Sequence, residues 1–419
     1  MEKNSNKKIH IIGAGISGLV AAIQLEKKGY EPIILEKDST VGGRVQTDII
    51  NGYQLDRGFQ VLLEAYPKAK EYLDYQALEL QPLYEGAILF QEGKKTAFGD
   101  PLRNSHFLFP ILSSKDASLK DKIKTYQLKK KLAKTSIDDI FKKEETTTLN
   151  YLQRQGFSER IIESFFRPFF SGIYLEPNLE TSSRMFEFVY KMFGEGRAMI
   201  PKKGMVAIPE QLLSQLKKTK IRFHCEVEKV NTTVIRMKGG EEIPSDFTII
   251  ATNPEKILPN YVSSLSWKRC DTLYFTVPKR NIQQAIIGLN KHPKCLVNNI
   301  FYSTSIETSS QGHEELLSIT IVKQHEYTLE ELISESIKEL ESVFDIKNLT
   351  FLKHYPIPHA LPSIKNIQCN IEPTATLITE GIAIAGDHQL NASLHAAMAS
   401  GEAAALMAHQ HLSGTKSII

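Results

Sequence analysis

A glycine turn between a short apolar strand and a helix is the feature that most limits what this chain can fold into. Residues 8–12 (Lys-Ile-His-Ile-Ile) predict a strand, and Gly13, Gly15 and Gly18 follow it with the spacing GxGxxG. Glu36 ends the next apolar segment. Strand, glycine turn, helix, strand and acid in this order are typical of a βαβ unit that binds the pyrophosphate and ribose of a dinucleotide. The N-terminal part therefore predicts a Rossmann-like α/β fold.

The residue types suit that chemistry. Gly13 allows the sharp turn, Gly15 lets the backbone approach the phosphates, and Gly18 lets the helix sit close to the strand. The start of the helix offers unpaired N–H groups and the positive end of a dipole to the pyrophosphate. Glu36 is placed to accept hydrogen bonds from a ribose diol, and its charge repels a 2′-phosphate. A tight strand–helix turn without a ligand is the alternative for the glycines alone.

Two further glycine-containing segments follow the second predicted strand. Gly42, Gly43 and Arg44 come first, and residues 55–60 (Leu-Asp-Arg-Gly-Phe-Gln) come after them. Paired glycines bring the backbone close to a bulky cofactor, and the planar cation of Arg44 suits a phosphate or the edge of a flavin. This order resembles the GGR and DxG segments of the flavin-containing amine oxidoreductases, a superfamily that includes monoamine oxidases, protoporphyrinogen oxidase and phytoene desaturases. A glycine loop with a surface arginine is the alternative for either segment alone.

The C-terminal part carries a similar segment. Residues 377–385 predict a buried strand that leads to Gly386 and Asp387, and a helix rich in small residues begins near Ser393. In the family that this resembles, the acid binds the ribityl chain and the helix N-terminus faces the pyrimidine side of the flavin. A helix N-terminus suits that place because reduced flavin gathers negative charge at N1 and O2.

Residues 220–230 resemble the superfamily strand whose valine meets the adenine through its backbone, and Val227 holds that position. A plain β-hairpin is the alternative there. The resemblance implies FAD as the cofactor, and it implies no metal ligand. The cofactor-binding residues that it implies are Gly13, Gly15, Ile16, Ser17, Gly18, Glu36, Lys37, Gly42, Gly43, Arg44, Gly58, Phe59, Gln60, Val227, Gly386, Asp387, Ser393 and Leu394.

The positions of these segments predict an interleaved chain. The fold class is α/β, with a GR2-type, Rossmann-like FAD-binding domain made of residues 1–95, 196–264 and 365–419. A helical insertion over 96–195 and an α+β substrate domain over 265–364 are expected between these parts. Within the helical insertion, Thr148 and Ser158 are predicted N-caps and Gly156 a helix stop.

Residues 165–174 (Phe-Phe-Arg-Pro-Phe-Phe-Ser-Gly-Ile-Tyr) bear on the substrate. They resemble a turn found in the protoporphyrinogen oxidase and desaturase branches. Their aromatic rings either wall a pocket for a flat or long apolar substrate or form the core of the helical insertion, and the core is the commoner outcome.

The chain departs from the amine-oxidase branch in two respects. Residues 355–362 contain no cysteine, where covalently flavinylated relatives carry theirs, and Cys369 is interpreted as a buried, inert thiol. The resemblance therefore implies that FAD is bound non-covalently. The two aromatic rings that hold an amine beside the flavin in those relatives correspond here to Ser393 and to a position near Ala360. The pattern favours the protoporphyrinogen oxidase and phytoene desaturase branch.

Composition excludes several other classes of function. With 419 residues and a net charge of +3, the chain is not basic enough to indicate nucleic-acid binding. Its four cysteines show no spacing typical of a metal site or a disulfide framework. A secretory signal and an apolar run of transmembrane length are not apparent, so a cytoplasmic location is expected. The lysine-rich stretch from Lys115 to Lys134 is either a solvated basic face or a peripheral membrane contact.

The sequence as a whole predicts an FAD-dependent oxidoreductase that transfers a hydride from a substrate C–H bond to flavin N5. The expected substrate is a small apolar molecule, carotenoid-like or porphyrinogen-like, which the enzyme dehydrogenates. An amine oxidase that produces imine and hydrogen peroxide remains an alternative, as does a non-catalytic flavin- or NAD-binding protein. No catalytic base is identified: His359, His388 and His395 are interpreted as structural or solvated, with His395 nearest to the expected flavin edge.

Overall fold

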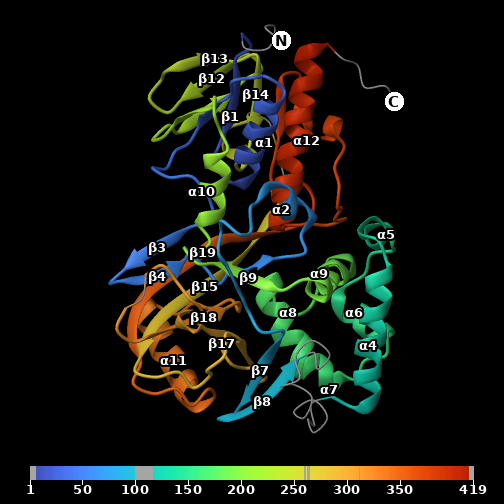
Figure 1. Cartoon of the computed structure of the whole chain (residues 1–419), viewed down its shortest axis with the longest axis vertical. Helices are drawn as coiled ribbons and strands as arrows, with labels where there is room; N and C mark the ends of the chain where they lie inside the picture. Colours follow the sequence, from blue (N-terminus) through green and yellow to red (C-terminus); the bar gives the residue numbers. More distant parts are fainter. Residues whose placement is uncertain (1–5, 100–116, 259–260, 262–264, 311, 415–419) are drawn as a thin grey trace.

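The computed structural model describes residues 6–99, 117–258, 261, 265–310 and 312–414. Within them, a six-stranded sheet occupies the upper half of the molecule as drawn in Figure 1. Its strands, in spatial order, are β10 (Lys220–Arg222), β2 (Ile33–Leu35), β1 (Ile9–Ile12), β14 (Phe247–Ile250), β21 (Ile382–Ile384) and β20 (Leu377–Thr379). The first five run parallel, and β20 pairs antiparallel with β21. This is the α/β, Rossmann-like sheet that the sequence predicted.

The two faces of this sheet are covered differently. Successive residues of a strand point to opposite faces. Ile249 therefore packs with helices α1 (Ile16–Lys27) and α12 (Leu394–Ser413), whereas Ile250 packs with a second, three-stranded sheet. That sheet consists of β11 (Val227–Val230), β12 (Val234–Met237) and β13 (Glu242–Pro244). Helices α1 and α12 lie side by side (Figure 1), so close that a Cβ atom on Gly401 would lie 2.3 Å from the carbonyl oxygen of Ser17.

A seven-stranded sheet forms a second layer of the molecule, below the first in Figure 1. Its strands, in spatial order, are β19 (Thr350–Ser363), β15 (Ser266–Val277), β18 (Glu315–Ile321), β17 (Val297–Tyr302), β16 (Ile287–Asn290), β7 (Gly86–Gln91) and β8 (Lys94–Gly99). Helix α11 (Leu329–Ser342) packs on it through Leu332 and Leu340. Strand β7 runs parallel to β16, which lies far along the chain, and β8 pairs with β7 at the edge of the sheet. The limits of the three predicted domains stay a prediction.

Residues 117–195 form a group of helices at the right of Figure 1. They are α4 (Leu119–Lys134), α5 (Ile137–Lys142), α6 (Thr148–Arg154), α7 (Glu159–Ile161), a π-helical turn (Ile162–Phe166), α8 (Arg167–Tyr174) and α9 (Ser183–Glu195). Ser158 caps α7 as predicted, and Gly156 follows the end of α6 with a φ of +74°. The prediction for Thr148 was wrong by one residue. Thr147 accepts the N–H of Asn150 as the N-cap, while the buried hydroxyl of Thr148 donates to the carbonyl oxygen of Thr181.

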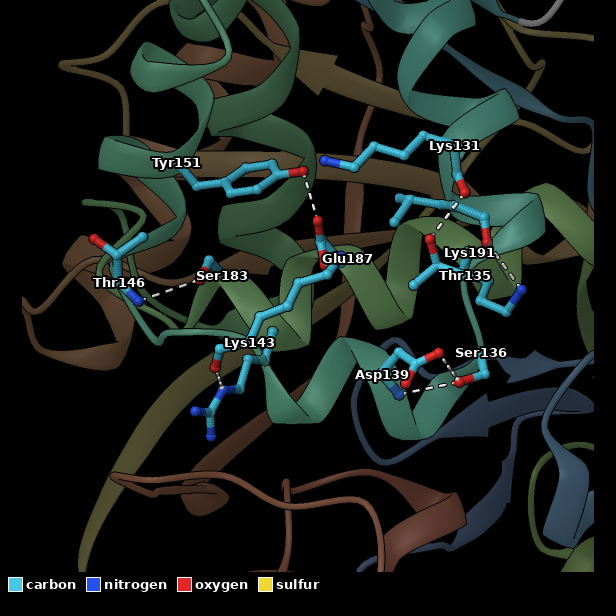
Figure 2. A network of polar contacts seen from close by, with 12 residues as sticks. Lys131, Thr135, Ser136, Asp139, Lys143, Thr146, Tyr151, Ser183, Glu187 and Lys191 are labelled. Carbon is cyan, nitrogen blue, oxygen red and sulfur yellow. Dashed lines mark hydrogen bonds and ion pairs between the residues drawn. The ribbon is translucent and has the colours of Figure 1, made fainter.

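A buried carboxylate ties these helices together, as Figure 2 shows. Glu187 on α9 accepts hydrogen bonds from Lys143 Nζ at 2.5 Å and from the hydroxyl of Tyr151 at 2.7 Å. Its side chain is only 2% exposed. Buried charges require such partners, because an unpaired carboxylate would lose its hydration without replacement. The three side chains thus link α5, α6 and α9.

The remaining elements connect these layers. They are the hairpin β3 (Thr47–Ile50) and β4 (Tyr53–Asp56), the small sheet of β5 (Leu62–Leu63), β9 (Ala198–Pro201) and β6 (Leu80–Pro82), and helices α2 (Pro67–Tyr72) and α10 (Ala207–Ser214). Short 3-10 turns occur at Pro254–Lys256, Ser303–Ser305, Pro373–Thr376 and Asp387–Gln389. Of the helices within the described residues, none combines the length and apolar character that crossing a membrane requires.

Candidate cofactor and substrate site

A large cavity opens at one edge of the six-stranded sheet. Strands β1, β2, β14 and β21 are parallel, so their carboxyl ends meet at this edge. The residues that follow these strands directly, Gly13, Glu36, Ala251 and Ala385, all line the cavity, whose volume is about 2000 Å³. Ligands of open α/β sheets bind at such carboxyl ends. All of the predicted cofactor-binding residues line this cavity except Gly18.

The glycine turn after β1 has the geometry that a phosphate site needs. Gly13 has a φ of +101°, and a Cβ atom there would lie 3.0 Å from the carbonyl oxygen of Ala251. Gly18 leaves no room for a side chain, because a Cβ atom there would lie 2.1 Å from the carbonyl oxygen of Gly13. Gly15 has open space on its Cβ side and caps α1 without a side-chain hydrogen bond. The first N–H groups of α1, at Ile16 and Ser17, are therefore available to an anion.

Glu36 is fixed in position next to this turn. One carboxylate oxygen accepts the N–H of Ala14 at 2.6 Å, and the other accepts the N–H of Asp38 at 2.9 Å. The side chain is buried at the wall of the cavity, beside Lys37. Each carboxylate oxygen keeps a free lone pair after these bonds. Glu36 can therefore still accept hydrogen bonds from a ligand hydroxyl.

The second glycine segment packs directly on the first. Gly42 N–H donates to the carbonyl oxygen of Ala14 at 2.9 Å, and Gly43 lies with a φ of +59° against Gly15. A side chain on Gly42 would overlap the carbonyl oxygen of Val45 at 2.4 Å. The paired glycines thus keep this part of the cavity wall free of side chains.

Arg44 joins the N-terminal and C-terminal segments. Its guanidinium donates to Asp387 at 2.5 Å and to the carbonyl oxygen of Ala360 at 3.1 Å. It also lies 5.3 Å from the ring centre of Trp267, which stacks on His359 with centroids 5.4 Å apart. Trp267 is the single tryptophan of the chain. Sequence reasoning missed it, although a lone tryptophan at the start of a strand was a usable signal.

The segment after β4 braces the Arg44 loop. Gly58 has a φ of +100° and packs against Ile357, where a Cβ would approach to 2.9 Å. Gln60 Nε2 donates to the carbonyl oxygen of Arg44 at 3.1 Å. The ring of Phe59 lies 5.1 Å from that of Phe301. The segment therefore sets the position of the arginine through its backbone.

The N-terminus of α12 forms the end wall of the cofactor part. Ser393 caps the helix by accepting the N–H of Ala396 at 3.0 Å, and Leu394 is its first residue. The N–H of Gly386 donates to the hydroxyl of Ser400 at 2.9 Å, which anchors the preceding loop. His388 lines the cavity, burial lowers its pKa, and its Nε2 atom has no hydrogen-bond partner. This nitrogen is buried, so it is an unpaired polar atom inside the wall.

His395, interpreted from the sequence as structural or solvated, is buried within the protein. His395 lies outside the cavity wall, because it occupies a different face of α12 from Leu394 and Ala397. Its ring packs between Tyr66 and Phe188, and Cys369 Sγ lies 3.9 Å from its Nε2 atom. Burial lowers its pKa to about 4, so the ring is neutral near pH 7. His395 is a core residue.

The cavity continues from the cofactor motifs into the helical region. The aromatic segment divides between wall and core: Phe165 and Phe169 are half-buried and line the cavity, whereas Phe166 is fully buried. Other rings of this wall are those of Phe98, Phe170, Tyr174, Tyr190 and Phe193. The first two rings of the segment, those of Phe165 and Phe166, end a π-helical turn at residues 162–166.

Lys268 is a second residue that the sequence did not reveal. It lines the cavity one residue after Trp267, and its Nζ donates to the hydroxyl of Thr181 at 2.9 Å. Burial lowers the pKa of Lys268. Thr181 in turn donates to a carboxylate oxygen of Glu176 at 3.0 Å. This polar chain crosses from the seven-stranded sheet to the helical region, a contact that no local pattern encodes.

Comparison with known proteins gives a consistent result. The model of the family described as flavin containing amine oxidoreductase matches residues 16–406. Coproporphyrinogen III oxidase of Bacillus subtilis (strain 168) is 23% identical over 320 residues, which cover 62% of this chain and 63% of that protein. Protoporphyrinogen oxidase 2 of Arabidopsis thaliana is 36% identical over 74 residues, or 18% of this chain and 15% of that protein. The alignments thus span less than two thirds of either relative.

Solved structures of other proteins share this fold. A crystal structure of an oxidoreductase from Methanosarcina mazei matches this fold with a TM-score of 0.72 and 17% identity. The match covers 94% of this chain and 98% of that chain. At this identity the likeness concerns the fold.

Proposed function

This chain belongs to the family of flavin-containing amine oxidoreductases and is an FAD-dependent oxidoreductase, and we propose that it dehydrogenates an apolar substrate. The observation that supports this is the single cavity wall that runs from the cofactor motifs to the aromatic rings of the helical region. The proposed substrate is carotenoid-like or porphyrinogen-like.

The residues of the cavity fit FAD in our proposal. The uncapped start of α1 and the open side of Gly15 suit the pyrophosphate, and Glu36 suits the ribose of the adenosine half. Val227 lines the same end of the cavity. Arg44 contributes a cation beside this group, already oriented by Asp387. The other residues named for the cofactor extend this wall.

When held by these residues, FAD would supply a two-electron acceptor for a hydride from a substrate C–H bond. The chain itself contributes position and environment. The N-terminus of α12, capped by Ser393, offers the positive end of a helix dipole to negative charge at the cofactor. The rings of Phe165 and Phe169 give the substrate part of the cavity an apolar wall.

Non-covalent attachment is also part of the proposal. Cys369 lies outside the cavity wall, against His395. Cys270 lines the cavity, but burial raises the pKa of its thiol to about 12. The thiolate, which is the reactive form of cysteine, is therefore scarce at neutral pH.

An amine substrate is the second candidate, and a specific observation favours it. The carboxylates of Glu145, Glu176 and Glu180 line the cavity and would attract a cation. Against it, Ser393 and Ala360 line the cavity without offering the two rings that hold an amine in the relatives. We therefore rank the apolar substrate first.

Anaerobic reduction of the bound flavin separates the two candidates. The holoenzyme is mixed without oxygen with a polyene, a porphyrinogen or a panel of amines, and flavin absorbance is followed. We expect bleaching by an apolar substrate and little by amines. Bleaching by amines alone would overturn the ranking while leaving the cofactor assignment intact.

A further inference from the structure

A row of polar side chains crosses the part of the seven-stranded sheet that lines the cavity. Thr272 on β15 pairs directly with Tyr355 on β19 and with Thr320 on β18, and Thr320 pairs with Asn299 on β17. Side chains of directly paired residues lie on the same face of a sheet. We call these four residues the polar row. Tyr355, Thr320 and Asn299 line the cavity, and Thr272 lies between Tyr355 and Thr320.

The polar row is buried. The exposed fractions of Thr272, Thr320 and Asn299 are 0%, 4% and 2%. The other face of the same strands carries apolar residues such as Leu273 and Ile319, which pack in one cluster with helix α11. Polar groups out of contact with water cost free energy unless hydrogen bonds replace the lost hydration. The partners of the polar row therefore decide whether the protein alone satisfies it.

The hydrogen bonds of the polar row are incomplete. The hydroxyl of Tyr355 is satisfied, because it donates to Asp48 at 2.7 Å. Asn299 Nδ2 donates to Thr320 Oγ1 at 3.3 Å, which is long for such a bond. Among the described residues, the hydroxyl of Thr320 finds no acceptor and Oγ1 of Thr272 has no partner. One O–H of Thr320 and one N–H of Asn299 are thus left as unused donors at the cavity wall.

The amide of Asn299 is held in a fixed orientation. Asn298 Nδ2 donates to the carbonyl oxygen of Pro168 on α8 and to Asn299 Oδ1, both at 3.0 Å. Helix α8 packs closely on β17 (Figure 1), since a Cβ atom on Gly172 would lie 3.1 Å from Asn299 Oδ1. The oxygen of the Asn299 amide is therefore engaged, and its NH₂ group is turned toward Thr320. The donors are in place before a ligand binds.

The polar row lies in the aromatic part of the cavity and carries no charge. Gly172 and Ile173, which adjoin the row from α8, line the cavity together with Phe169. The residues predicted to bind the cofactor all lie outside β15, β17, β18 and β19. Lys268 lies four residues before Thr272 on β15, and its Nζ is bound to Thr181. A buried carboxylate would need a paired cation at the row, so the row suits a neutral oxygen.

We propose that Thr320 and Asn299 bind a neutral oxygen of the substrate, a hydroxyl or a carbonyl group. The substrate is then an apolar molecule with a polar group at one place, and not a bare hydrocarbon. This inference rests on the proposed function, because it describes the substrate of that same cavity. A hydrocarbon placed against the row would leave both donors buried and unpaired, which weakens its binding.

A pair of ligands tests the proposal with the full-length holoenzyme. The probes are retinol and the hydrocarbon of the same carbon skeleton that lacks its hydroxyl group, and equilibrium dialysis without oxygen in dilute detergent gives the two dissociation constants. We expect the wild type to bind retinol at least about tenfold more tightly than the hydrocarbon. Retinoic acid, which carries a carboxylate in place of the hydroxyl, should bind more weakly than retinol.

Two variants connect this preference to the polar row. Thr320→Val removes a hydroxyl at nearly constant shape and should reduce the preference for retinol to about threefold or less. Asn299→Leu should reduce it in the same way. Thr276→Val is the matched control, since Thr276 is 8% exposed on β15 but lies outside the cavity wall. It should keep the wild-type preference, and all variants should keep their FAD.

Several results would overturn the proposal. Equal binding of retinol and the hydrocarbon, or no binding of retinol, contradicts it, as does tightest binding of retinoic acid. A wild-type preference in both Thr320→Val and Asn299→Leu would mean that the row holds only water. The proposed function fails by a different result, namely flavin bleaching by amines alone. A hydrocarbon that bleaches the flavin as fast as its alcohol would contradict only the role of the polar row.

Discussion

Glu36 connects the two backbone segments that meet at the start of the cavity. Its carboxylate accepts one N–H from Ala14, in the glycine turn, and one from Asp38, just before the second glycine segment. One acid at the end of β2 therefore positions both segments. The sequence indicated the ligand role of Glu36 but not this bracing role, because the partners are backbone groups.

Glu36→Gln tests this pair of bonds. Glutamine has one acceptor oxygen, so its NH₂ group must face the N–H of either Ala14 or Asp38. A buried donor left unpaired costs about 1–3 kcal/mol, and we expect FAD affinity to fall about tenfold or more. Titration of the apoprotein with FAD measures it. Glu380→Gln, at an exposed site, is the control. Unchanged affinity in Glu36→Gln would contradict the assigned role.

His395 makes the stability of the folded protein depend on pH. Burial lowers its pKa to about 4, against an ordinary value of 6.5 in the unfolded chain. Above pH 6.5 neither state binds the proton; between pH 6.5 and about 4 the unfolded state takes it up first, so stability falls as the pH falls. His10, with a pKa lowered to about 4, acts in the same direction.

We expect the unfolding free energy of His395→Leu to fall less than that of the wild type as the pH is lowered from 6.5 to 4. The full effect of one such histidine is about 3 kcal/mol. Urea unfolding at several pH values measures it, and His313→Leu, at an exposed histidine, should keep the wild-type pH dependence. A wild-type slope in His395→Leu would mean that the ring already titrates in the folded protein.

At the scale of elements, the aromatic run from Phe165 to Tyr174 combines two roles. Phe166 faces the core at 0% exposure, while Phe169 faces the cavity. Composition alone could not assign these rings, because both faces of the run are aromatic. Their spacing decides it, because Phe165 and Phe169 are four residues apart and share one side of the helical segment, whereas Phe166 lies on another.

Phe166→Ala and Phe169→Ala should therefore affect different properties, the first mainly stability and the second mainly the reaction with substrate. Phe166→Ala leaves a buried void and should lower the unfolding free energy by about 3–5 kcal/mol. Phe169→Ala should cost less stability but slow flavin bleaching by an apolar substrate. Urea unfolding and stopped-flow absorbance give the two readouts, with Phe223→Ala at a 36% exposed surface site as control. Equal behaviour of the two variants would contradict the division.

At the scale of the whole molecule, the sequence predicted those features that short local patterns encode, namely the parallel strands and the cofactor segments that follow them. Gly13, Glu36 and Asp387 follow strands β1, β2 and β21, which run parallel, and parallel strands bring their carboxyl ends together. That rule alone gathered Gly13, Glu36 and Asp387 at one edge. The α/β fold followed from these local patterns, whereas the family and the cofactor followed from the resemblance of the glycine segments to flavin-containing amine oxidoreductases.

What the sequence did not predict depends on long-range pairing. Strand β7 pairs with β16 across almost 200 residues of chain, and Lys268 meets Thr181 only after the helical region packs on the seven-stranded sheet. Trp267 reaches Arg44 in the same way. Such contacts leave no periodicity in the sequence, because the residues next to each partner in the chain are those of an ordinary strand or loop.

The central claim is that segments from the start, middle and end of the chain enclose one FAD molecule beside Trp267. Because Trp267 is the single tryptophan, its fluorescence reports on this place alone. Titrating the apoprotein with FAD should quench that emission until one FAD per chain is bound, and Trp267→Phe should show almost no signal to quench. Emission that stays constant in excess FAD would contradict the account.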